Sequence, residues 1–110
     1  MSISLVLTGY ALSFSGQLAQ MEALAAARRT AALLDLLAST ALREGCEIAF
    51  RPPLPQGSFA RIMGHSLALR LGGITASWPL AHDFMPALLL PGETYWLSGQ
   101  GGRAAVRPWS

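Results

Sequence analysis

Residues 17–43 read QLAQMEALAAARRTAALLDLLASTALR, and they carry the clearest structural signal in the chain. It consists largely of strong helix formers and contains no proline. Ser15 or Gly16 stands where a helix N-cap is preferred, and Gly45 follows where a C-cap is favoured. The spacing therefore predicts one long helix over residues 17–43.

This helix has a thin polar stripe, and leucines occupy much of the remaining circumference. A helix that is apolar on this many sides is usually covered on two of them. We expect Leu33, Leu34 and Leu37 to pack on a sheet. Part of the opposite side would then be free to meet a partner.

Apolar and small polar residues alternate over residues 2–14, and the phase of the alternation slips at Thr8-Gly9. Alternation with period two predicts a strand, and a glycine at the slip suits a β-bulge or a tight hairpin turn. Residues 46–50 alternate as well, which predicts a half-buried strand with Cys46, Ile48 and Phe50 on one face. Proline-rich residues 51–57 predict a loop, and residues 59–63 a short strand.

Two hairpins are expected in the rest of the chain. The first joins strands 67–71 and 74–78 across Gly72-Gly73 and ends at Pro79; the second joins 94–98 and 103–107 across residues 99–102. Between them, Asp83 could cap a short helix over residues 84–90, with Pro86 in its first turn. The helix would stop at Pro91-Gly92.

The expected fold is therefore α+β, with a long N-terminal helix packed on a mostly antiparallel sheet of two or more hairpins, and a second short helix. The 110 residues suit one domain, divided into a strand-helix-strand part (1–51), a Pro-rich loop (52–57) and a β-rich half (58–110).

Charged residues make up only 13% of the chain, against roughly 25% in an average soluble domain. The scarcity of charge predicts apolar surface meant for a protein partner. All eight basic residues are arginines, and their scattered positions argue against a nucleic-acid interface.

The absence of Lys and Asn is typical of GC-rich bacterial genomes. With no signal-peptide pattern and no apolar run of about 20 residues, we expect a cytoplasmic protein without membrane insertion.

The chain has few side chains that could act in catalysis: two His, one Cys and six carboxylates. His65 lacks the pattern of a nucleophile elbow, and His82-Asp83 are sequence neighbours whose side chains usually diverge. Cys46 is expected to be a small core residue, and no His/Cys spacing predicts a metal site. We therefore predict no catalytic, cofactor-binding or metal-binding residues. A small enzyme that uses His65, His82 or Cys46 in a pocket shared between subunits stays open.

The aromatic residues of the C-terminal half lie on predicted strands or at the terminus, where they either pack in the core or form a platform for a partner. Trp109, which follows Pro108 near the chain end, is the aromatic most expected to meet a partner. The candidate interface residues are Leu33, Leu36, Leu37, Trp96 and Trp109.

The second half of the chain presents, in order, LALRLGGI (67–74), PLA (79–81), LLPGE (89–93), YWL (95–97) and GRAAV (102–106). Residues 66–107 thereby resemble the surface-presentation-of-antigens (SpoA) domains of flagellar switch and type III secretion cytoplasmic ring proteins. The resemblance implies strands, a short Leu-rich helix and a Pro-Gly corner. It also implies a structural subunit without catalysis whose β-domains pair into intertwined dimers beside an export apparatus.

The leading hypothesis is a non-catalytic assembly subunit that forms a homo-oligomer or an obligate heterocomplex, with no cofactor. The alternative is a chaperone, adaptor or inhibitor that binds one specific partner.

Overall fold

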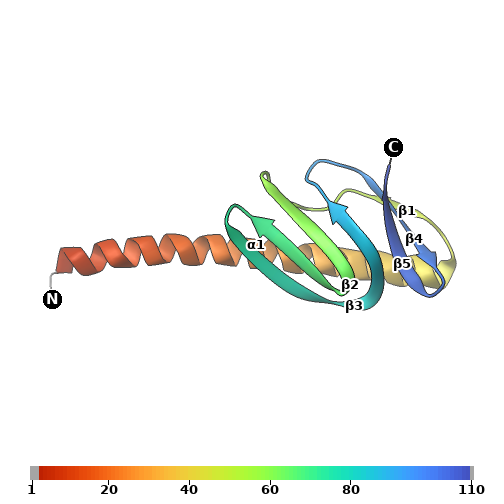
Figure 1. The fold of residues 1–110 in the computed structure, drawn as a ribbon, viewed down its shortest axis with the longest axis horizontal. Coiled ribbons are helices and arrows are strands. Elements are labelled where there is room, and N and C mark those ends of the chain that lie inside the picture. Colours follow the sequence, from red (N-terminus) through yellow and green to blue (C-terminus); the bar gives the residue numbers. More distant parts are fainter. Residues whose placement is uncertain (1–2, 110) are drawn as a thin grey trace.

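The computed structural model describes the backbone of residues 3–109 and the side chains of residues 18–109. One helix precedes five strands: α1 (Ile3–Glu44), β1 (Ile48–Phe50), β2 (Ser58–Leu71), β3 (Ile74–Leu89), β4 (Tyr95–Gln100) and β5 (Arg103–Pro108). The sheet lies against the C-terminal half of α1, and the N-terminal half of the helix runs on past it (Figure 1). The α+β class is confirmed.

The strands form one sheet in the order β1-β4-β5-β3-β2. All neighbours are antiparallel except β3 and β5, which run parallel and pair only at Phe84 and Ala104. Both expected hairpins are present. The first turns at Gly72, whose φ is 62°, and the second at Gly101 and Gly102, whose φ values are 59° and 82°. Each turn needs a φ that residues with a Cβ rarely adopt, so glycine is required there.

The face of α1 that packs on the sheet is made mostly of alanines. Its fully buried residues follow helical spacing and are small apart from Leu34: Ala23, Ala26, Ala27, Thr30, Ala31, Leu34, Ala38 and Ala41. The large core side chains come from the sheet instead: Ile62, Leu67, Leu69, Phe84, Leu89 and Leu97. Small residues let the helix approach the sheet closely, so the strands fill the space between the layers.

The expected strand over residues 2–14 is wrong, because the backbone is already helical at Ile3; Ser2 lies outside the described residues. Alternating apolar residues need a neighbouring strand to form a ladder, and Figure 1 shows no strand beside this part of α1. Extending an existing helix adds one hydrogen bond for each residue fixed, so the helix continues through the segment.

The second short helix is also a wrong expectation: residues 84–89 belong to β3, and the described chain contains one helix. Pro79 does not end the strand, nor does Asp83 cap a helix. The register between β2 and β3 slips near Gly64, where Met85 and Pro86 together oppose Met63. This bulge accommodates Pro86, which cannot donate to a regular ladder.

Two smaller differences concern the β1–β2 region. Cys46 is exposed and precedes β1, which begins at Ile48 opposite Leu97, so it is not the core residue expected. The short strand expected at residues 59–63 is part of the 14-residue strand β2. The pairing of β2 with the equally long β3 sets its length, and the local apolar pattern did not show this.

Candidate functional site

The helical candidates Leu33, Leu36 and Leu37 have different environments. Leu36 is 66% exposed, whereas Leu33 and Leu37 are partly buried and pack against the core. Leu34, which was expected to pack on the sheet, is fully buried there. Of the three candidates, Leu36 is therefore the one with a large free apolar surface.

The two tryptophan candidates come together. The rings of Trp96 and Trp109 stack with centroids 4.7 Å apart and planes 9° apart. The Arg107 guanidinium lies 5.9 Å from the Trp96 ring centroid and is paired with Glu47 at 2.9 Å. Stacking of this kind holds the indoles in place. Trp109 is still 54% exposed, so one ring of the stack meets solvent.

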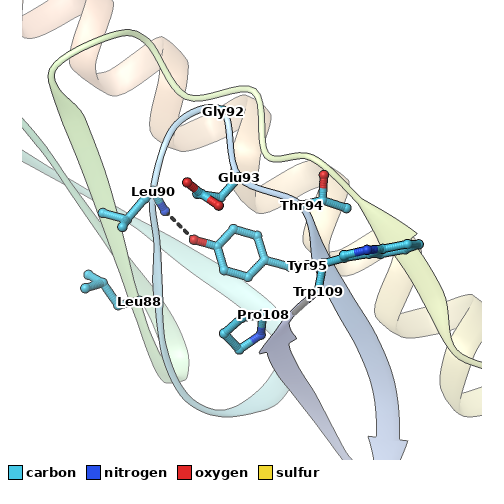
Figure 2. A pocket seen from close by; sticks show the side chains of 8 residues that line it. All are labelled: Leu88, Leu90, Gly92, Glu93, Thr94, Tyr95, Pro108 and Trp109. Carbon is cyan, nitrogen blue, oxygen red and sulfur yellow. Dashed lines mark hydrogen bonds between the residues drawn. The ribbon is translucent and has the colours of Figure 1, made fainter.

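A hollow of about 360 Å³ lies beside this stack, where the C-terminal ends of β3 and β5 run next to each other (Figure 2). Leu88 and Leu90 line one side of it, and Pro108 and Trp109 the other. The Tyr95 hydroxyl accepts a hydrogen bond from the Leu90 backbone N–H at 2.7 Å. This bond joins β4 to the end of β3 and closes the bottom of the hollow.

The second apolar surface lies on α1, and the sequence reading did not identify it. Leu18, Met21 and Leu24 are exposed by 48%, 64% and 45%. Together with Ala25, Arg28 and Trp78 of β3, Met21 and Leu24 line a hollow of about 230 Å³. The Arg28 guanidinium lies 5.9 Å from the Trp78 ring centroid. This surface becomes visible only when the alanine face of the helix is known to be the buried one.

Polar groups that could carry chemistry are engaged in structural contacts. His82 Nδ1 lies 3.2 Å from Asp35 Oδ1, and His65 Nδ1 lies 3.2 Å from the Leu80 carbonyl oxygen. Asp83 pairs with Arg103 at 2.9 Å, so the side chains of His82 and Asp83 have separate partners. Over residues 18–109, no hydroxyl or thiol is hydrogen-bonded to either imidazole.

Cys46 is exposed on the surface at the end of α1. In the described part of the chain, no three His, Cys, Asp or Glu residues are grouped so that they could hold a metal ion. A nucleophile with its base, or a metal with its ligands, is what hydrolytic and transfer chemistry needs. The described residues do present apolar surfaces of the kind that protein interactions use.

Comparisons with family models, with curated proteins and with solved structures found no match. Within the described residues, no helix is both long and apolar enough to cross a membrane.

Proposed function

We propose that this chain is a non-catalytic assembly subunit that associates with further copies of itself through helix α1. The observation that carries the proposal is the free length of this helix. α1 has 42 residues and is therefore about 63 Å long. Among residues 18–44 of α1, whose side chains are described, the buried ones run from Ala23 to Ala41, a rise of about 27 Å.

A helix that projects from its domain needs other contacts to hold it. Isolated helices are marginally stable in water, and most helical stability in proteins comes from packing. Leu18, Met21 and Leu24 lie where α1 passes the margin of the sheet, and all three are exposed. Contiguous apolar surface of this kind marks sites of protein interaction. Burying it against other copies would remove the apolar side chains from water.

A more specific form of this proposal is that the chain is a ring subunit of the SpoA kind, which residues 66–107 resemble. The short helix that the resemblance implies is not present in the described residues, because residues 84–89 belong to β3. Self-assembly through α1 does not depend on membership of such a ring.

The proposal is tested by measuring the absolute mass of the purified protein by light scattering over a concentration series. We expect a mass of at least twice the 11.7 kDa of one chain. Leu36→Asp and Met21→Asp should each shift the protein toward monomer, because a charge would be desolvated in the contact. Gln56→Asp, which makes the same charge change in an exposed loop, should leave the mass unchanged.

Circular dichroism of each variant separates a lost contact from a lost fold. A monomer at every concentration in the wild type would overturn the proposal and favour an adaptor that binds one partner.

A further inference from the structure

We infer that two copies pair through α1 in an antiparallel arrangement, with Ala25 of one helix against Ala25 of the other. This inference rests on the self-assembly proposed above and specifies its geometry. The occupant of the free face of α1 is then the same face of a second copy, related by a two-fold axis.

The first argument is a stripe of residues along the side of α1 that faces away from the sheet. Leu18, Met21, Ala32 and Leu36 are exposed and Ala25 is half-buried; these five residues follow one another at intervals of three, four, seven and four, which keeps them on one side of a helix. Two alanines near the middle of the stripe allow two helix axes to approach to about 8 Å. The buried alanines occupy the opposite side, so a second helix on the stripe does not meet the sheet.

The second argument is charge complementarity. Glu22 precedes Ala25 by three residues and Arg29 follows it by four, and both are exposed on the same flank of the stripe. In an antiparallel pair centred on Ala25, Glu22 of one copy lies beside Arg29 of the other. The two-fold axis makes this contact twice.

In a parallel pair in register, like charges would meet instead of opposite ones. Its two-fold axis runs along the helices, so the flank with Arg29 in one copy meets the flank with Arg28 in the other. Two pairs of like charges would then lie next to each other, which disfavours the contact.

The third argument is the fit between a protruding side chain and a hollow. The 230 Å³ hollow on the other flank of the stripe is lined by Met21 of the same chain together with Leu24, Ala25, Arg28 and Trp78. In the antiparallel pair, Met21 of the second copy lies level with position 29, one residue beyond Arg28, and therefore next to the Arg28 end of this hollow. A flexible thioether side chain adapts well to an irregular apolar space. Met21 is also 64% exposed in the single chain, so its burial would remove a large apolar side chain from water.

The fourth argument is the length of the helix. α1 spans residues 3–44, whose midpoint lies close to Ala25, so an antiparallel pair overlaps along almost the whole of both helices. The helical segment before Leu18 then runs beside Leu36 of the other copy. The first charged residue of the chain is Glu22, so this segment brings no charge to Leu36.

Disulfide trapping tests whether Ala25 of one copy faces Ala25 of the other, and the charge reversals below test the antiparallel direction; all cysteine variants are made in a Cys46→Ser background. Ala25→Cys should give a disulfide-linked dimer on mild oxidation, because the two residues face each other across the axis. Gln56→Cys, which is exposed on a loop, is the matched control and should give none. Cross-linking of Gln56→Cys as efficient as that of Ala25→Cys would show random collision and overturn the inference.

Charge reversal gives a second readout that does not depend on oxidation. Glu22→Arg and Arg29→Glu should each weaken the dimer by about fivefold or more, since two contacts are lost and like charges meet. The two reversals in one chain should restore most of the affinity. Failure of the double variant to recover would also overturn the antiparallel geometry.

The outcomes separate this inference from the proposed function. A mixture of Ala25→Cys and Ala32→Cys chains that forms only mixed disulfides indicates parallel helices staggered by one heptad. That result would overturn the antiparallel pair and keep self-assembly through α1. A wild-type monomer at every concentration would overturn both.

Discussion

The carboxylate of Asp35 in α1 accepts hydrogen bonds from the backbone N–H of Ala81 in β3, at 2.9 Å and 3.1 Å for its two oxygens. The same carboxylate accepts one from the His82 backbone N–H at 3.2 Å. These amides lie between Pro79 and Phe84, where the register of β3 with β2 slips. Asp35 thus satisfies strand amides that the irregular ladder leaves free, and it fixes α1 to β3.

Replacing Asp35 should weaken this attachment. Asp35→Ala removes the acceptor for two amides and should lower the free energy of unfolding by about 1–3 kcal/mol, as measured by urea denaturation. Asp35→Asn keeps one acceptor oxygen and should lower the free energy of unfolding by less than Asp35→Ala does. Glu44→Ala, which removes an exposed carboxylate paired only with Arg43, should change stability by less than about 0.5 kcal/mol. Equal effects of Asp35→Ala and Glu44→Ala would contradict the role given to Asp35.

Gly99 should resist substitution because of the helix behind it. A Cβ on Gly99 would lie 2.7 Å from Leu42 Cδ2 and 3.4 Å from Leu42 Cα, so the Leu42 side chain must move. Gly99→Ala should therefore cost about 1 kcal/mol of stability. Gly73→Ala is the control, because a Cβ there has no neighbour within 4 Å.

A double-mutant cycle separates crowding by Leu42 from a change in strand propensity at position 99. In a Leu42→Ala background, Gly99→Ala should cost clearly less, since the crowding atom is gone. An identical cost in both backgrounds would show that Leu42 is not the reason.

The Tyr95 hydroxyl should protect one backbone amide. Tyr95→Phe keeps the ring beside Phe50, whose centroid lies 6.0 Å away, and removes only the acceptor for the Leu90 N–H. We expect a loss of about 1 kcal/mol and faster hydrogen exchange at Leu90, measured by NMR. The Leu97 amide, in the middle of the β4 ladder, is the internal reference. Unchanged protection of Leu90 would mean that the bond does not hold the end of β3.

Local chemistry was sufficient to predict the long helix and both hairpins. The run from Gln17 to Arg43 favours a helix by composition, and Gly72 supplies the positive φ that the tight hairpin turn needs. These signals act over a few residues, so they can be read from the chain directly. The α+β class follows from them.

Where a segment could form either a strand or a helix, its neighbours decided. Residues 3–14 alternate like a strand but continue α1, and residues 84–89 were expected to be helical but pair with β2. Period two and a Pro at a possible first turn are weak signals compared with an adjoining helix or a long neighbouring strand.

Composition and spacing are enough to show that α1 is apolar on more than one side, that charge is scarce, and that glycines close two hairpins. Which side of α1 is buried depends on the packing of the helix against the sheet. Hydrophobicity could not choose between the alanine and leucine sides, because both are apolar. Close packing against the large side chains of the sheet selects the alanines, and this leaves Met21 and Leu36 exposed.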